Sequence, residues 1–82
     1  MRMVDSANLA DILDLVQEEL AEAMEKFPPI NSMHEGWAVV WEELDEAWED
    51  VRACHLPNAS AEMLQVAAMA IRFIYDLNQE KG

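Results

Sequence analysis

Cysteine, glycine and proline are all scarce in this 82-residue sequence, which has one, two and three of them respectively. Because Cys54 has no second cysteine to pair with, an intramolecular disulfide is excluded, and a lone thiol fits a reducing cytoplasm. No apolar run approaches the about 20 residues of a membrane-spanning helix. The start, "MRMVDSANLADILDL", is amphipathic and acidic, so we expect neither a signal nor a transit peptide. We therefore expect one small cytoplasmic domain over residues 1–82.

Basic residues are also few, with five Lys and Arg against 17 Asp and Glu and a net charge of −12. Nucleic-acid backbones bind to basic surfaces, so we expect no nucleic-acid partner. Repulsion between like charges also argues against binding to an anionic membrane surface. An acidic surface does suit divalent cations and, through them, polyanions such as a triphosphate.

The prolines divide the chain at two breaks, "FPPINS" (27–32) and "CHLPNAS" (54–60). The segments left between them are rich in Ala, Leu, Met, Glu and Gln, which are good helix formers. No strand-like alternation occurs. We expect an all-α fold with three helices at about 6–26, 33–53 and 60–79.

Helix starts and apolar stripes can be placed within these segments. Ser32 followed by Glu35 predicts a capping box at the second helix, and Asn58 or Ser60 is the expected cap of the third. Apolar residues recur at helical spacing in each segment. These stripes are Leu9, Ile12, Leu13, Val16, Leu20 and Ala23; Trp37, Val40, Trp41, Leu44, Trp48 and Val51; and Met63, Val66, Ala67, Ala70, Phe73, Ile74 and Leu77.

A chain of this size buries only about 60% of its unfolded surface, which makes a lone monomer marginally stable. The second and third helices carry more apolar surface than three helices can hide. We therefore expect a homodimer in which helices pair across a two-fold axis into a four-helix core.

Six of the nine residues in "EELDEAWED" (42–50) are carboxylates. Glu43 and Glu46 are three residues apart and share one helix face, where like charges repel. The third segment carries a polar stripe of Glu62, Gln65, Arg72 and Asp76. If the two helices are adjacent, a cation between Glu43, Glu46 and Glu62 would compensate the charge. The alternative is a solvated acidic face without a ligand.

These residues resemble the MazG-like, all-α nucleoside triphosphate pyrophosphohydrolases, and in particular their short phage and integron members. The family signature is EExxE, a spacer, then ExxD. "EELDE" (42–46) matches the first half, and "EMLQ" (62–65) matches the second except that Gln65 replaces the acidic residue. The wider likeness covers residues 27–78.

The resemblance implies an enzyme that hydrolyses (d)NTPs to monophosphate and pyrophosphate with Mg²⁺, and assembly as dimers or dimers of dimers. Glu43, Glu46 and Glu62 would be metal ligands, and Glu42 would be a ligand or would orient the attacking water. Gln65 can still offer a carbonyl oxygen, but it adds no charge. A helical dimer that has lost the chemistry and binds a basic partner is the alternative function.

Five further residues are candidates for contacting the nucleotide: Asn31, His34, Trp37, Arg72 and Asp76. Arg72 is either a phosphate clamp or the partner of Asp76 or of carboxylates on the second helix. His34 and Asn31 either contact base or phosphate, or are solvated residues at a helix entrance. Trp37 either stacks on a base or belongs to the core or dimer interface.

Overall fold

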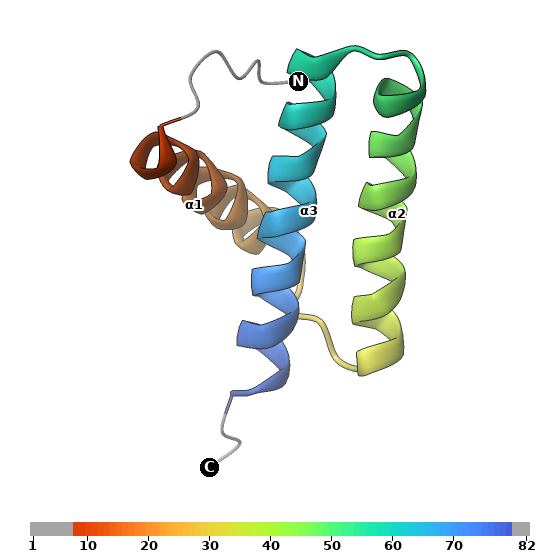
Figure 1. Ribbon diagram of the computed structural model, residues 1–82. Helices are drawn as coiled ribbons and strands as arrows, with labels where there is room; N and C mark the ends of the chain where they lie inside the picture. Colours follow the sequence, from red (N-terminus) through yellow and green to blue (C-terminus); the bar gives the residue numbers. More distant parts are fainter. Residues whose placement is uncertain (1–7, 80–82) are drawn as a thin grey trace.

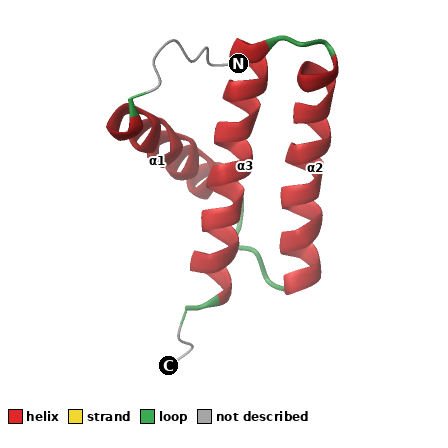
Figure 2. Cartoon of the chain, in the orientation of Figure 1, coloured by secondary structure: helices red, strands yellow, loops and turns green. Residues whose placement is uncertain are grey.

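The computed structural model describes residues 8–79 and contains three α-helices: α1 (Leu9–Lys26), α2 (Met33–Arg52) and α3 (Leu56–Leu77) (Figures 1 and 2). Within that range no strand occurs, so the prediction of an all-α chain is confirmed. Residues 6 and 7, where the first helix was expected to start, lie outside the described residues. No helix in residues 8–79 has both the length and the apolar character of a membrane span.

Side-chain caps set the starts of α1 and α2. The Asn8 carboxamide oxygen accepts from the backbone N–H groups of Ala10 and Asp11. The Ser32 hydroxyl accepts from the backbone N–H of Glu35 at 3.0 Å, which confirms the Ser32 half of the predicted capping box. Each cap satisfies a donor that has no partner inside its own helix.

The prediction that the third helix starts at residue 60, capped by Asn58 or Ser60, is wrong. α3 starts at Leu56, and its cap is His55, whose Nδ1 accepts from the Asn58 backbone N–H at 3.2 Å. Pro57 does not delay the helix because the N–H groups of a first helical turn have no intrahelical partner. The break between α2 and α3 is therefore shorter than the sequence indicated.

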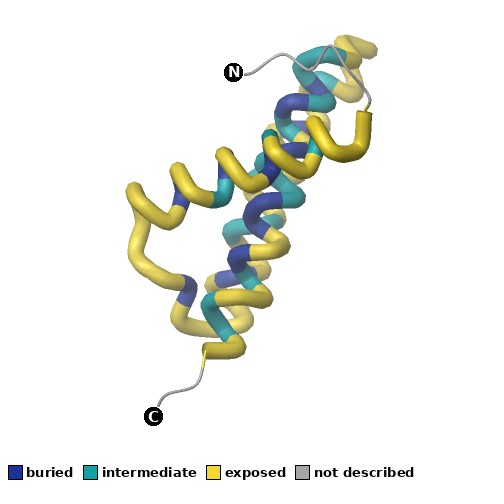
Figure 3. The backbone as a smooth tube through the Cα atoms, turned by 90° about the vertical axis from the view of Figure 1, so that its left-hand side faces the viewer, coloured by how far each residue is buried: buried dark blue, intermediate teal, exposed yellow. Residues whose placement is uncertain are grey.

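α3 is the central helix of the molecule. α2 runs antiparallel beside it, and α1 packs obliquely against the other side of α3 (Figure 1). Buried positions follow α3 and one side of α1 (Figure 3). Val16, Ala23, Leu64, Ala68 and Met69 form a contiguous cluster of buried apolar side chains between α1 and α3.

The face of α2 that contacts α3 is built from small and acidic residues. Gly36, Val40, Glu43, Ala47 and Asp50 are buried or half-buried and follow one another at spacings of four and three. This spacing is typical of a helix seam against a neighbour. It turns Glu43 toward α3.

Apart from Val40, which is half-buried on the face toward α3, the predicted tryptophan stripe of α2 lies in solvent in the single chain. Its other members are between 42% and 68% exposed, and we call them the tryptophan face: Trp37, Trp41, Leu44, Trp48 and Val51. An exposed apolar face of this kind typically marks an interaction surface.

Candidate metal centre and adjoining cavity

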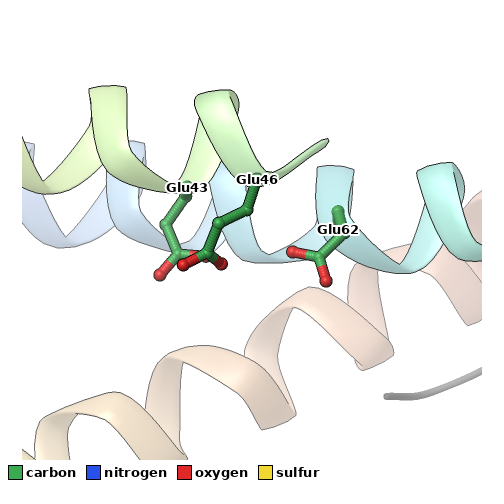
Figure 4. Close-up of side chains that lie close together, drawn as sticks. All are labelled: Glu43, Glu46 and Glu62. Atoms are coloured by element: carbon green, nitrogen blue, oxygen red, sulfur yellow. The ribbon is translucent and has the colours of Figure 1, made fainter. Parts of the chain in front are cut away.

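Three carboxylates converge where α2 packs against α3. Glu43 and Glu46 come from α2 and Glu62 comes from the first half of α3 (Figure 4). One carboxylate oxygen from each lies within 4.8 Å of the other two. The antiparallel packing thus brings together the three carboxylates that the sequence analysis placed around a cation. Among residues 8–79 they form the one group of three acidic, histidine or cysteine side chains this close.

Charge repulsion and burial both act on this carboxylate cluster. Burial, followed by the charges of Glu46 and Glu62, raises the pKa of Glu43. Burial, followed by the charges of Glu46 and Asp50, raises the pKa of Glu62. Each shift means that the ionised form is disfavoured in the fold. A cation among the three oxygens would remove this penalty.

Mg²⁺ fits this cluster by its chemistry. It takes hard oxygen ligands and is usually held by a few carboxylates together with waters and substrate phosphates. Glu43, Glu46 and Glu62 supply three such carboxylates, and the partial exposure of Glu46 and Glu62 leaves room for water and phosphate. No softer ligand belongs to this group.

A cavity of about 420 Å³ adjoins the cluster at Glu43. α1 and α2 form its walls, with Glu19 and Lys26 on one side and Glu42 on the other, and α3 contributes Gln65, Met69 and Arg72. Pockets for small molecules are commonly about 300–1,000 Å³. The mixture of charged and apolar lining suits a ligand that has both a charged and an apolar part.

Glu19 is a residue of this cavity that the sequence analysis missed. It is only 8% exposed although it is a carboxylate, because it lies on the core-facing side of α1 between Val16 and Ala23. Gln65 donates through Nε2 to Glu19 Oε2 at 2.5 Å. A carboxylate at an inward position of an apolar stripe was the sequence signal that could have revealed it.

Arg72 and Asp76 form a buried pair on α3. Their side chains are 5% and 7% exposed, and Arg72 Nε lies 3.4 Å from Asp76 Oδ2. Arg72 also donates to the Pro28 carbonyl, and Asp76 accepts from the Ile30 backbone N–H at 2.9 Å. The pair therefore holds the α1–α2 connection against α3, which matches the structural alternative, while Arg72 also lines the cavity.

The remaining candidates for contacting the nucleotide lie away from this cavity. His34 and Trp37 line a second hollow of about 340 Å³ with Met33 and Phe73. Asn31 is exposed in the α1–α2 connection. The structure thus groups Glu42, Glu43, Gln65 and Arg72 around one cavity and does not place these three residues there.

No protein-family model, no curated protein and no solved structure matches the chain. The resemblance to the MazG-like family therefore stays a prediction carried by residues 42–46 and 62–65.

Proposed function

We propose that the protein is a Mg²⁺-dependent nucleotide pyrophosphohydrolase with a house-cleaning role. The observation that carries the proposal is the convergence of Glu43, Glu46 and Glu62 beside a cavity large enough for part of a nucleotide. In the reaction, one water adds across the α–β phosphoanhydride bond of a (d)NTP. The products are a (d)NMP and pyrophosphate, and the water's proton passes to solvent through a nearby base.

The residues take distinct roles in this proposal. Glu43, Glu46 and Glu62 hold the cation, which when bound neutralises phosphate charge and lowers the pKa of a coordinated water. Glu42 lines the cavity next to Glu43, where its carboxylate can accept a proton or orient the attacking water. Without a cation, the acidic cavity wall would repel a triphosphate, so binding of substrate and of metal is coupled.

Basic side chains at the other end of the cavity suit the phosphate tail. Lys26 is exposed there, and its Nζ lies 3.7 Å from Glu22 Oε1. An exposed ion pair of this kind is weak, so Lys26 can leave Glu22 and bind a phosphate instead. Arg72 adds a fixed positive charge, although its N–H groups already serve Asp76 and Pro28. Phe27, whose ring lies 5.9 Å from the Arg72 guanidinium carbon, offers an apolar surface beside them.

We further propose that the chain assembles as a homodimer or a dimer of dimers. The tryptophan face supports this, because five neighbouring apolar residues of one helix stay exposed in the single chain. A second copy could cover this face and complete a four-helix core. The lone exposed thiol of Cys54 leads us to place the assembly in the cytoplasm.

A non-enzymatic helical module that binds a basic partner is the second candidate. The observation that favours it is the engagement of the Gln65 amide by Glu19, at the position where the resemblance leads one to expect an acidic ligand. The two candidates differ in their ion requirement. Only the enzyme needs a specific divalent cation, whereas a charged docking face responds to any salt.

The test is pyrophosphate release from a panel of NTPs and dNTPs, with Mg²⁺ and with a chelator. Glu43→Gln keeps the shape of the side chain and removes one charge, and Asp45→Asn removes a charge from the same helix outside the cluster. We expect Mg²⁺-dependent turnover that falls by at least about 10-fold in the first variant, since even groups that only orient a metal ligand change activity by about 10- to 100-fold, and that persists in the second. Absence of turnover on every nucleotide by a folded protein would favour the interaction module.

A further inference from the structure

Glu19 is a buried carboxylate on the one helix that supplies none of the three clustered carboxylates. Glu19 is 8% exposed and lies among the apolar residues by which α1 contacts α3. Burial of a carboxylate is unfavourable unless hydrogen bonds compensate for the lost water. The 2.5 Å hydrogen bond from Gln65 Nε2 supplies such a bond from α3.

The charge of Glu19 fixes the orientation of the Gln65 carboxamide. An ionised carboxylate only accepts hydrogen bonds, so Gln65 must turn its NH₂ group toward α1. The carbonyl oxygen of Gln65 then projects from the opposite side of the same carboxamide carbon. With a neutral group at position 19, the two ends of the carboxamide could exchange.

Gln65 also lies beside the carboxylate cluster. It follows Glu62 by three residues and so shares its face of α3, and it lines the cavity together with Glu43 and Glu19. Glu19 is linked to this face through its hydrogen bond from Gln65 Nε2. Glu19, Gln65 and the cluster thus form one polar group that spans α1, α3 and α2.

We propose that Glu19 is a positioning residue of the cation site. By accepting the Gln65 N–H, it holds the carboxamide so that Gln65 Oε1 is the oxygen offered to a divalent cation, or to its water, at Glu43, Glu46 and Glu62. The inference rests on the proposed function only in requiring a cation at this cluster. It makes α1 part of the site and gives glutamine a defined role where a carboxylate was expected. Groups that orient metal ligands in this way typically change affinity by about 10- to 100-fold.

The first test measures Mn²⁺ binding by titration calorimetry, because Mn²⁺ takes the same oxygen ligands as Mg²⁺. Glu19→Gln is isosteric and removes the charge that makes position 19 accept only, so that either end of the Gln65 carboxamide can face it. We expect its dissociation constant for Mn²⁺ to rise about tenfold, with unchanged helicity by circular dichroism. Glu25→Gln, on an exposed position of α1 away from the cavity, is the matched control and should bind as the wild type does.

A double-substitution cycle separates positioning from a simple loss of negative charge. If Glu19 acts through Gln65, then Glu19→Gln has no further effect on Mn²⁺ affinity once Gln65→Met has removed the carboxamide. If Glu19 acts by charge alone, the two effects multiply, and the proposal is overturned.

The exchanged pair Glu19→Gln with Gln65→Glu provides a second readout that does not need a folded Gln65→Met variant. The exchange keeps the charge count and reverses the direction of the hydrogen bond, while Gln65→Glu alone puts a half-buried carboxylate against the buried one of Glu19. In urea unfolding we expect the single Gln65→Glu variant to be less stable than the exchanged pair. We also expect the exchanged pair to bind Mn²⁺ at least as tightly as the wild type, since its carboxylate now belongs to α3.

The outcomes distinguish this inference from the proposed function. Loss of Mn²⁺ binding in Glu43→Gln together with wild-type binding in Glu19→Gln would overturn the positioning role and leave the cation site standing. Wild-type binding in Glu43→Gln would instead overturn the cation site itself.

Discussion

Glu43 lies at the point where α2 contacts α3 and where the cavity begins. Its position explains why its carboxylate is both partly desolvated and close to two other negative charges. Such a residue lowers stability in the metal-free chain, yet it is the residue best placed to share a cation between the cluster and a ligand in the cavity. Natural sites often retain groups that stability alone would not favour.

The burial and crowding of these carboxylates also make the stability of the metal-free chain depend on pH. The folded-state pKa values of Glu43 and Glu62 are raised above the ordinary value of a glutamate carboxyl, so over part of the pH range the folded chain holds protons that the unfolded chain has already released. Stability therefore rises as the pH falls through the folded-state pKa values of these two groups, and the destabilising effect is complete above them. Urea unfolding of the metal-free chain should show this rise. The rise should be smaller in Glu43→Gln than in Asp45→Asn, and equal slopes in both would contradict the assignment.

Cys54 gives a second prediction at a single position. It adopts φ 57°, in the left-handed region, because α2 ends in a hydrogen-bonded turn in which His55 N–H donates to Asp50 C=O and Cys54 N–H donates to Val51 C=O. Glycine is the usual residue at this place. Cys54→Gly should raise the free energy of unfolding by about 0.5–1 kcal/mol, because it relieves the left-handed strain and retains the turn. Cys54→Ala, which keeps the Cβ, should give no such gain in thermal or urea unfolding.

The helix pair α2–α3 depends on a close approach at Gly36. A Cβ added there would lie 2.3 Å from Phe73 Cδ2 and 2.7 Å from Phe73 Cε2, so Ala cannot be accommodated without displacing the ring. Gly36→Ala should therefore destabilise the chain by about 1–3 kcal/mol, despite the higher helix propensity of alanine. In a Phe73→Ala background the same change should stabilise it by up to about 1 kcal/mol. A stabilising effect of Gly36→Ala in the wild type would show that the two helices are further apart.

The helices could be predicted from the sequence to a large extent, and the reasons are local. Prolines marked both breaks, and Ser32 with Glu35 marked the start of α2. The start of α3 could not be predicted because histidine is not among the preferred caps, and only its hydrogen bond to Asn58 N–H reveals it.

The site could be predicted in part. Glu43, Glu46 and Glu62 followed from helical spacing and from the antiparallel order of two adjacent helices. The inward position of Glu19 in the α1 stripe was visible in the sequence, but its hydrogen bond to Gln65 depends on how α1 crosses α3. The side of α2 that faces α3 could not be predicted either. The tryptophan stripe and the face that contacts α3 recur with the same helical period, and the small residues Gly36 and Ala47 decide between them.

For the whole molecule, the tryptophan face is the feature that a single chain leaves unexplained. If a second copy covers it, replacing Trp41 and Trp48 with glutamine should shift the sedimentation-equilibrium mass from dimer or tetramer to monomer. Leu13→Gln, at an exposed apolar position on α1, is the matched control and should leave the mass unchanged. Because a small domain gains stability from its partner, the double variant should also melt at a lower temperature. A wild-type chain that stays monomeric at high concentration would refute the assembly.

Acidic character is the other property of the whole chain. A net charge of −12 makes any added salt mildly stabilising, because counter-ions screen the repulsion among 17 carboxylates. A specific site must therefore be recognised against this background. Comparison at matched ionic strength, with a variant that alters the cluster alone, separates the two effects.

The most direct test of the proposed metal centre is the melting temperature of the wild type, Glu46→Gln and Asp45→Asn in Mg²⁺ and in NaCl of equal ionic strength. A cation that binds only the folded state raises the melting temperature as its concentration increases. At 100 times its dissociation constant it adds about 2.7 kcal/mol to the free energy of unfolding. The cluster of Glu43, Glu46 and Glu62 predicts a saturable Mg²⁺ effect in the wild type and Asp45→Asn that is lost in Glu46→Gln. Equal responses to Mg²⁺ and NaCl in all three proteins would contradict it and leave the acidic helix as a solvated face.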